Sequence, residues 1–536
     1  MKKAMKFFSM AALCIATVAM VGCSKDEEQP AGSGKVVVST TTIGLGSSEA
    51  SKHLDESGTK TFAAGEEIAV VYENTSSTMV KASVTLAAGD ISNGGKEATV
   101  SVAMTDPKAD GAVTFIYPAS MANDDGTVNY DALYNNQDGT MATLSSNFDY
   151  AEYSGTLSGV DLPADPVLTN QLAVLKFTVQ NTANSQDITD SVTKLTIKHG
   201  SDIYSVTPAT SQSTFWVAVK PIAANDGDIA IYAAVGKDLY KKTVSSYGDL
   251  AAGTFNRIAV GTTQVPGALS GLFRVNAAGD LVYFSQGNLQ ATTADLGVQW
   301  SWAFATNQWD YIGNATANNK INGNGTVSAN GTVDLFGWST AATTFGIHNS
   351  KSNSTYSGDF VDWGPNAISN GGNTANSGWR TLTGGGSGEW GYLFNTRASG
   401  STVNGTSNAC YTQATINTDG TSISGIILFP DNVTIAAGEA TSWGTINGNS
   451  AWGTRCTTAQ WAALEAKGCV FLPAAAYRNG STASYAGVGG YYWSSTPDAS
   501  NASYAYGVYF SSGYLRPANG YDRNFGRSVR LVRQVE

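Results

Sequence analysis

The chain has few of the residues on which most catalytic centres and nucleic-acid-binding surfaces depend. Only 3 of its 536 residues are His, which argues against most His-based zinc sites and His-dependent catalytic triads. Charged residues make up 14%, against roughly 25% in an average soluble domain. The formal net charge of -11 opposes nucleic-acid binding, because phosphate contacts need clustered Lys and Arg. A helical bundle is excluded too, since it needs many Glu, Lys and Leu at helical spacing.

Cysteine is equally scarce and offers no disulfide framework. Cys14 and Cys23 lie near the N-terminus, which leaves Cys410, Cys456 and Cys469 for the folded protein. One pair could form and leave an odd thiol, but no CxxC metal or redox spacing occurs. We interpret these three as structural or free thiols, and we predict neither a metal nor a cofactor.

Gly, Ser, Thr and Asn take the place of the missing charge, which is typical of β-rich surface proteins with many turns. Gly reaches 59 residues while Pro stays at 13. At roughly 100–200 residues per domain, 536 residues predict about three structural units. The 42% hydrophobic content is enough for sizeable cores. We therefore expect a mainly β protein.

Only one long apolar run is present, and it lies at the N-terminus. Lys2, Lys3 and Lys6 precede the apolar residues 7–22. This run is too short to span a bilayer comfortably and fits the apolar region of a secretory signal peptide.

The residues at the end of this run carry a second signal. Residues 20–23 (MVGC) resemble a bacterial lipobox, although the first of them stands where Leu is usual. The resemblance implies a lipoprotein signal peptide at 1–22, lipidation of Cys23 and a flexible tether at 23–34. Residues 24–28 (SKDEE) resemble the surface-export signal of Bacteroidetes lipoproteins. We expect a lipid-anchored protein of the outer membrane, at the cell surface or in a fimbrium; an ordinary secretory signal with a chance Cys is the alternative.

The N-terminal half reads as short strands between turns. β-branched and aromatic runs lie at 36–38, 67–72, 113–117, 175–179, 215–219 and 229–232. Strands at this spacing indicate β-sandwiches rather than a parallel sheet. The composition changes after residue 262, because eleven of the twelve Trp follow it.

This half resembles the fimbrillin family, the subunits and accessory proteins of Bacteroidetes pili. The motifs that carry the resemblance are 59–70 (TKTFAAGEEIAV), 115–118 (FIYP), 168–179 (LTNQLAVLKFTV) and 250–258 (LAAGTFNRI). The resemblance implies two tandem fimbrillin-type β-sandwiches, at 35–165 and 166–262, and we place a linker at 263–270.

The family also implies polymerisation, in which a partner's strand completes an open sheet edge. Some pilins of this family become polymerisable after cleavage at an Arg, and no Arg precedes Arg257 here. Cleavage at Lys52 or Lys60 by another protease is one alternative. A sandwich stalk that never polymerises is the other.

The C-terminal half, 271–536, carries an ordered series of motifs. They lie at 271–290, 302–313, 334–340, 362–368, 379–383, 389–394, 425–431, 470–475, 491–496 and 526–532. The series resembles secreted Bacteroidetes domains with an α+β C-type-lectin-like fold, related in shape to the formylglycine-generating enzymes. The resemblance implies a small sheet packed on two helices with long loops.

Two helices can be read in this half. One begins at Ser387-Gly388-Glu389 and places Trp390, Leu393 and Phe394 on one face. The other runs from about Ala459 to Lys467, is capped by Thr457 or Thr458, turns Trp461 and Leu464 inward, and stops at Gly468.

No residue constellation indicates an enzyme. Cys456 and Cys469 show nothing that would activate them as an oxidase pair. The lectin calcium site is unsupported, because Gly364-Pro365-Asn366 lacks its acid, and we read Asp362 as an ordinary capping or turn acid. Most Trp lie inside apolar motifs, which favours core packing over a sugar-binding platform.

The stretch from Tyr491 to Arg530 has the composition of a binding surface. Tyr, Asn, Ser, Asp and Arg crowd together, the mixture that paratopes use. A strand here would bury Tyr506, Val508 and Phe510 and expose Tyr509 and Ser511. In some bacterial proteins with the resembled fold this stretch is diversified by a retroelement; a fixed polar loop is the alternative. We predict ligand contact by Tyr504, Tyr509, Tyr514, Arg516, Asn519, Tyr521, Asp522 and Asn524.

Together these features predict a cell-surface lipoprotein adhesin or pilus tip-type subunit. Its partners would be a host or bacterial surface protein or glycan, together with other fimbrial subunits. The alternative is a structural fimbrial or surface-layer subunit without a specific ligand.

Overall fold

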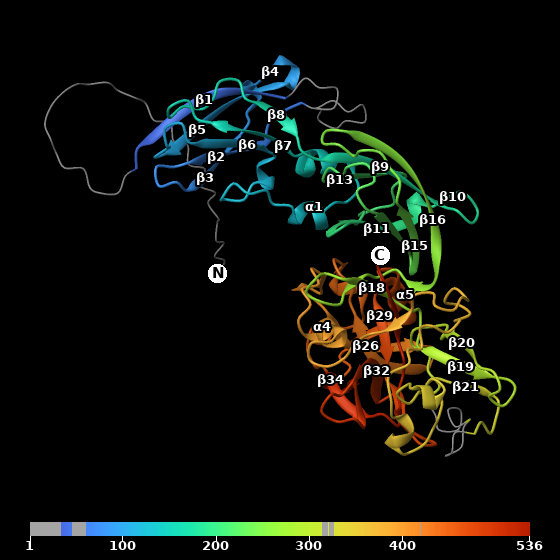
Figure 1. Ribbon diagram of the computed structural model, residues 1–536. Helices are drawn as coiled ribbons and strands as arrows, with labels where there is room; N and C mark the ends of the chain where they lie inside the picture. The colour runs from blue at the N-terminus through green and yellow to red at the C-terminus, as the bar shows by residue number, and fades with distance from the viewer. Residues whose placement is uncertain (1–33, 46–60, 314–319, 321–325, 419) are drawn as a thin grey trace, which may run out of the picture.

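The computed structural model describes residues 34–45, 61–313, 320, 326–418 and 420–536, and this part of the chain is mainly β (Figure 1). Two eight-stranded sheets follow one another in the N-terminal half. Five smaller sheets with helices α4 (Glu389–Asn395) and α5 (Thr458–Ala466) follow in the C-terminal half.

The predicted lipoprotein signal at 1–22 and the predicted lipid on Cys23 lie outside the described residues. None of the helices in the described part is long and apolar enough to cross a membrane.

The first sheet has the order β3-β2-β6-β7-β8-β1-β5-β4. Its strands are β1 (Val36–Leu45), β2 (Glu67–Glu73), β3 (Met79–Thr85), β4 (Ile91–Ser92), β5 (Glu97–Thr105), β6 (Ala112–Tyr117), β7 (Ala151–Thr156) and β8 (Val167–Asn170). The sheet is curled, so that residues of β5 such as Val100 and residues of β6 such as Phe115 share one core. Alternation along β5 turns every second side chain into this core.

The second sheet has the order β10-β9-β16-β15-β14-β11-β12, and β13 pairs with β9. Its strands are β9 (Ala173–Asn181), β10 (Gln186–Asp187), β11 (Val192–His199), β12 (Asp202–Val206), β13 (Phe215–Val219), β14 (Ile229–Val235), β15 (Asp238–Val244) and β16 (Phe255–Leu269). The six sequence runs predicted as strands in this half all lie in strands.

The segment predicted as a linker lies mostly within β16. This strand pairs with β9 up to Thr262 and then with β15. The turn residues Pro266 and Gly267 fall where the register with β15 shifts, between the pairs Asp238–Leu269 and Tyr240–Gln264. A Pro-Gly pair therefore forms an irregularity inside a strand instead of a free connection.

Elements cross the predicted boundary between residues 165 and 166. β8, which follows the boundary, pairs with β7 and β1 of the first sheet. Helices α1 (Asp131–Asn135) and α2 (Met141–Thr143) precede it, yet Leu133 joins the core of the second sheet. That core also contains Val71 and Ile116 of the first sheet, so the two sheets are packed together.

The C-terminal half divides its strands among five sheets. The first of the five contains β17 (Phe273–Arg274), β18 (Leu281–Phe284), β36 (Leu531–Gln534) and β22 (Arg380–Thr381), and the second of the five contains β20 (Ser301–Phe304), β19 (Leu289–Thr293) and β21 (Gly331–Val333). The third contains β24 (Thr406–Ser407), β23 (Thr402–Val403) and β27 (Thr434–Ile435), and the fourth contains β28 (Thr454–Thr457), β25 (Tyr411–Thr418), β26 (Thr421–Leu428) and β29 (Val470–Pro473). The fifth contains β31 (Thr482–Ala486), β30 (Ala475–Asn479), β32 (Gly489–Pro497), β33 (Tyr504–Ser511), β34 (Tyr514–Asp522) and β35 (Phe525–Gly526).

The two helices predicted in this half are confirmed. Helix α5 begins after Thr457, whose hydroxyl accepts a hydrogen bond from the Gln460 backbone N–H, and it buries Trp461 and Leu464. Helix α4 buries Trp390, Leu393 and Phe394, but Gly388 caps it without a side-chain bond. The Glu389 carboxylate instead binds the guanidinium of Arg380 through two bonds of 2.6 and 2.7 Å.

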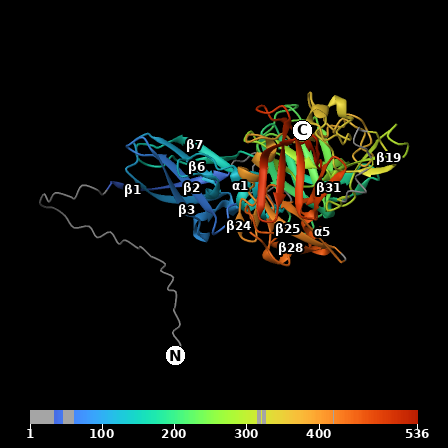
Figure 2. The ribbon, with the colours of Figure 1, turned by 90° about the horizontal axis from the view of Figure 1, so that it is seen from below.

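The second sheet and the C-terminal half share a hydrophobic core. Tyr232 and Leu239 of the sheet belong to the same cluster as Tyr283 and Leu531. Across this junction, the Lys241 ammonium also pairs with the Glu536 carboxylate at 2.5 Å. Figure 1 shows the C-terminal half next to β15 and β16, and Figure 2 shows the first sheet to one side of it.

Candidate functional site

One tyrosine from each of five strands lies on the same side of the sheet β31-β30-β32-β33-β34. We call this surface the tyrosine face and define it by Tyr477, Tyr485, Tyr491, Tyr509 and Tyr514. Ring centroids lie 5.9 Å apart for Tyr477 and Tyr485, 5.0 Å for Tyr477 and Tyr491, 4.8 Å for Tyr491 and Tyr509, and 6.1 Å for Tyr509 and Tyr514. Tyr485 and Tyr514 are 57% and 43% exposed, so the ends of this row are open to a ligand.

A bulge in β34 brings further predicted residues to this side. Tyr509 pairs with Arg516 and Gly507 pairs with Asn519, so two steps along β33 match three along β34. Strict alternation would put Arg516 and Asn519 on opposite sides, and the extra residue puts them on the same side. Tyr521 lies two residues after Asn519 and therefore points to the same side of the sheet. The Arg516 guanidinium lies 5.0 Å from the Tyr514 ring centroid. The structure thus gathers five of the eight predicted contact residues beside one another.

A buried cation packs against aromatic rings on the same side of the sheet as the tyrosine face. The Arg527 side chain is 1% exposed, and its guanidinium lies 3.7 Å from the ring centroid of Tyr521, 4.8 Å from Trp493 and 5.1 Å from Tyr491. Its Nε and Nη1 atoms have no hydrogen-bond partner within the described part of the chain. Burial lowers the pKa of Arg527 to about 10, which leaves it charged at neutral pH. The three rings therefore help to stabilise this charge through cation–π contacts, and the contacts hold the rings in position.

The turn between β33 and β34 is fixed by Gln413 of β25. Its Nε2 atom donates to the carbonyl oxygens of Ser511 and Tyr514, each at 3.0 Å, and its Oε1 atom accepts from the Gly513 backbone N–H at 2.9 Å. Gln413 is fully buried. Gly513 has a φ of +71°, which favours glycine at this point. Tyr514 is thus presented from a rigid turn.

Three predicted contact residues lie neither in the tyrosine face nor beside it. Tyr504 and Asp522 pair with each other and point to the opposite side of the sheet, where Asp522 accepts a hydrogen bond from Asn353. Asn524 is 4% exposed, and its amide donates to the Lys351 carbonyl. Alternation also places Tyr506 on the side of the buried Val508 and Phe510. Tyr506 packs on the loop at Gly384 and Gly385 and is only half-buried.

Sequence reasoning missed three members of the tyrosine face. Tyr491 lies within the stretch considered but was not among the predicted contacts, and Tyr477 and Tyr485 precede that stretch. The signal available in the sequence was the continuation of the Tyr-, Ser- and Asn-rich composition back to residue 477. What the composition could not give is the pairing of β30 with β31 and β32 that brings these rings together.

An aromatic hollow of about 570 Å³ continues the tyrosine face past β31. Trp309, Asp310 and Tyr311 line it, together with Gln290, Ile423 and Ala486. Ala486 follows Tyr485 directly, so the hollow and the row of rings adjoin. Tyr485 itself has a φ of +66°, a conformation that is uncommon outside glycine and that is often found at functional sites.

The segment that carries these aromatic residues is held by the buried side chain of Gln308. Its Oε1 atom accepts from the Phe471 backbone N–H at 2.8 Å and from Arg530 at 2.7 Å, while its Nε2 atom donates to the Cys469 carbonyl at 3.1 Å. On the other side of the hollow, the Asp334 carboxylate accepts from the Ile312 backbone N–H at 2.7 Å. A loop fixed at both ends can present Trp309 and Tyr311 with little loss of conformational freedom on binding.

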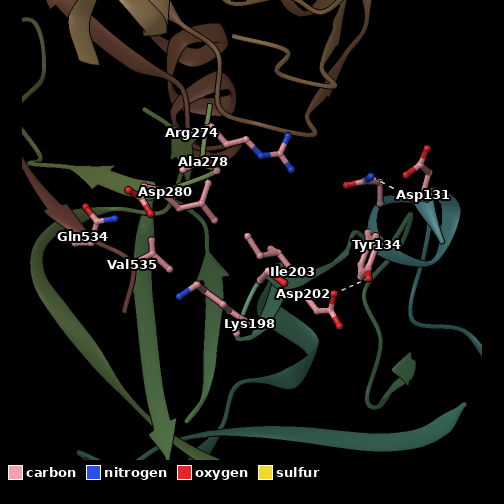
Figure 3. Close-up of a pocket in the computed structure, with 15 residues that line it drawn as sticks. Asp131, Tyr134, Lys198, Asp202, Ile203, Arg274, Ala278, Asp280, Gln534 and Val535 are labelled. Carbon is pink, nitrogen blue, oxygen red and sulfur yellow. Dashed lines mark hydrogen bonds between the residues drawn. The ribbon is translucent and has the colours of Figure 1, made fainter. Parts of the chain in front are cut away.

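A second, polar cavity of about 610 Å³ lies at the junction of the two halves (Figure 3). Asp131, Tyr134 and Asp202 line it from the second sheet and its helix, and Arg274 and Asp280 line it from the C-terminal half. The Tyr134 hydroxyl donates to Asp202 at 2.6 Å. Burial, helped by this carboxylate, raises the pKa of Tyr134 well above its usual range. The Asp202 carboxylate is therefore engaged within its own wall.

The remaining candidate chemistry of the sequence takes structural roles. Asp362 accepts hydrogen bonds from the backbone N–H groups of Gly364 and Thr381, which confirms it as a turn acid. Cys410, Cys456 and Cys469 are free and buried. Among the described residues, no group of three or more His, Cys, Asp or Glu could hold a metal ion.

Comparisons with known proteins give similarities over parts of the chain. A family model described as a domain of unknown function (DUF8237) matches residues 456–532, which include all five residues of the tyrosine face. No curated protein matches the chain.

Among solved structures, a fimbrial assembly protein from Parabacteroides distasonis is 13% identical, with a TM-score of 0.25, covering 47% of this chain and 95% of that one. A candidate cell adhesion protein from Bacteroides uniformis is 14% identical, with a TM-score of 0.25, covering 42% and 96%. A candidate adhesin from Bacteroides thetaiotaomicron is 8% identical, with a TM-score of 0.25, covering 45% and 97%.

Proposed function

We propose that this protein is a lipid-anchored, cell-surface adhesin or pilus tip-type subunit that binds its ligand through the tyrosine face. The observation that carries the proposal is the row of five tyrosine rings, one per strand, open at both ends. Tyr side chains give large, rigid contact areas at a low entropy cost, which is why binding surfaces use them.

The support beneath this surface favours binding over a merely structural role. The Gln413 turn and the Arg527 cation fix the rings before any ligand arrives, so little ordering cost opposes association. The outer strand β34 carries Pro517 and a bulge, which discourage the addition of a further strand at this edge. The ligand, a host or bacterial surface protein or glycan, would therefore meet side chains rather than the sheet edge.

The rest of the chain would present this surface. The predicted lipid on Cys23 would hold the N-terminus at the outer membrane, and the two packed sheets would act as a stalk. In Figure 1, β34 lies on the side of the C-terminal half away from β15 and β16. A C-type-lectin-like class for this half accords with the motifs at 271–536.

The test is binding of the soluble chain, residues 24–536, to host cells, mucins and bacterial surfaces. We expect the double variant Tyr509→Ala/Tyr514→Ala to lose binding by about tenfold or more. Tyr504→Ala is the matched control, because Tyr504 lies on the same strand and points to the other side. Equal binding by the wild type and the double variant, or binding to none of these surfaces, would contradict the proposal.

The aromatic hollow has its own matched pair of variants. Trp309 and Trp443 are both half-buried and pack against the same core, but only Trp309 lines the hollow. We expect Trp309→Ala to weaken binding several-fold and Trp443→Ala to leave it unchanged, while both lower thermal stability. Equal binding by the two variants would exclude the hollow from the ligand site.

A structural subunit is the second candidate, and the edge of β1 favours it. β1 pairs along its length with β5 but meets β8 only at Gly44 and Leu45. Near the open part of this edge, Val36 and Val38 are 59% and 69% exposed. A partner's strand could add here. Ladders of polymers on gels run without boiling would support this function, and a single monomer band would oppose it.

A further inference from the structure

A third cavity, of about 580 Å³, lies where the second sheet meets the C-terminal half. Lys194 of β11 and Pro208 line it on one side. The other side of the cavity is formed by Leu272, by Pro430 and by Ala466 of helix α5. Cavities of this size at domain boundaries commonly bind small ligands.

The charged side chains that line this junction cavity are all cations. Its lining contains no Asp or Glu and two cations, Lys194 and Lys467. Lys467 is neutralised by Glu439 at 2.7 Å. The Lys194 ammonium donates only to backbone carbonyl oxygens, at 2.7 Å to Asp431 and 3.3 Å to Asn432, and it forms no salt bridge among the described residues.

The nearby Asp431 carboxylate forms no direct ion pair with Lys194, because both of its oxygens already have other partners. One of its oxygens lies 2.7 Å from the guanidinium of Arg397, and the other accepts from the Arg274 backbone N–H at 2.9 Å. Lys194 therefore keeps a charge without a counter-ion beside the cavity. The opposite wall is largely apolar, with Leu272, Pro430 and Val433.

We propose that the junction cavity binds a small aliphatic carboxylate, whose charged group pairs with Lys194 and whose hydrocarbon chain lies against the apolar wall. Such a ligand would touch the second sheet and the C-terminal half at once. Because the ligand would bind only when the second sheet and the C-terminal half are packed together, it would stabilise this packing by mass action.

The charge of Lys194 gives this site a defined pH dependence. Burial lowers the pKa of Lys194 to about 8; the Asp431 carboxylate opposes this shift, and the Arg274 guanidinium adds to it. A carboxylate needs the protonated amine as its partner. Binding is therefore expected to weaken as the pH rises from 7 to 9.

The probe is octanoate, titrated into residues 24–536 and followed by calorimetry and by the thermal unfolding midpoint, with octanol and octylammonium as uncharged and cationic controls. We expect octanoate alone to bind and to raise the midpoint at pH 7. Lys194→Met should weaken binding by about tenfold or more. Lys198→Met, four residues along β11 and outside this cavity, should bind like the wild type.

A second variant keeps the test decisive if Lys194→Met does not fold. Ala466→Phe fills the cavity from helix α5 and leaves the ammonium in place, and it should also abolish octanoate binding. The proposal is overturned if octanol binds as tightly as octanoate, if Ala466→Phe binds normally, or if millimolar octanoate causes no change.

Discussion

Asp431 shows at the scale of one residue how a buried charge is accommodated in this protein. The Arg397 side chain is 0% exposed, and its guanidinium binds the Asp431 carboxylate at 2.7 Å and the Phe429 carbonyl at 2.8 Å. We expect Asp431→Ala to lower the free energy of unfolding by about 3–5 kcal/mol, because it leaves a buried cation without a counter-ion. Chemical denaturation measures this loss.

The control is Glu439→Ala, which breaks the half-exposed pair with Lys467. Exposed ion pairs contribute only about 0–1 kcal/mol, so this loss should be small. Equal losses in the two variants would show that the interior around Arg397 admits enough water to screen its charge.

The three thiols make a second prediction at this scale. Burial raises the pKa of Cys456 to about 12 and raises the pKa values of Cys410 and Cys469 as well. Ellman's reagent at pH 8 should therefore label no thiol in folded residues 24–536 and all three after unfolding, because the reagent needs an accessible thiolate. Labelling of the native protein would mean that this interior opens.

The raised pKa of Cys456 also predicts the direction in which the free energy of unfolding changes with pH. A thiol with a raised pKa in the folded state contributes stability that is full below its unfolded pKa, about 8.5, and is lost as the pH rises through the folded value. The free energy of unfolding of the wild type relative to Cys456→Ala should thus fall above about pH 9.

At the scale of elements, the turn between β33 and β34 depends on one side chain from another sheet. Gln413→Ala removes three hydrogen bonds and leaves the Gly513 N–H without that acceptor. We expect a loss of roughly 1–3 kcal/mol and faster hydrogen exchange confined to this turn. Binding through Tyr514 should weaken with it, although no residue of the tyrosine face has changed.

A matched control is Gln460→Ala, which removes the glutamine of the α5 capping box. It should lower stability without changing exchange at Gly513 or ligand binding. If Gln413→Ala leaves the exchange rate at the turn unchanged, the turn is held by its own strand pairing and not by Gln413.

Local patterns predicted the elements well and their assembly less well. The spacing of Trp461 and Leu464, with Thr457 before them and Gly468 after, defined helix α5 because caps and apolar period are local signals. Alternation assigned Val508, Phe510, Tyr509 and Ser511 of β33 correctly, whereas Tyr506, which it predicts as buried, is only half-buried. It could not assign the sides of β34, because a bulge depends on how a strand pairs, and Pro517 alone does not say whether the chain bends or ends there.

The candidate site follows the same division. Five of the eight predicted contacts lie together since composition marks exposed, Tyr-rich strands. Composition grouped Asn524 with them, but composition does not report burial, and the amide of Asn524 bonds the Lys351 carbonyl in the interior. The segment 263–270 looked like a linker for a similar reason, since Pro266 and Gly267 signal a turn in any context, including an irregular strand.

At the scale of the whole molecule, the two halves form one packed body. Tyr232 and Leu239 of the second sheet share a core with Tyr283 and Leu531 of the C-terminal half. The strand β16 enters this junction without a flexible connection, and the Glu536 backbone N–H donates to the Tyr232 hydroxyl at 3.0 Å. A force applied at the tyrosine face would thus be transmitted to the second sheet through packed side chains rather than through a hinge.

This packing predicts that the C-terminal half is weakened when it is separated. Residues 271–536 alone would expose the surface that Tyr232 and Leu239 cover, whereas residues 171–536 retain it. We expect the shorter piece to unfold at a lower temperature and to bind the dye ANS, which reports exposed apolar surface. Scattering from residues 24–536 should fit a single rigid shape. If the two pieces unfold at the same temperature, the shared core adds little, and the C-terminal half is an independent domain whose orientation on the stalk is free to vary.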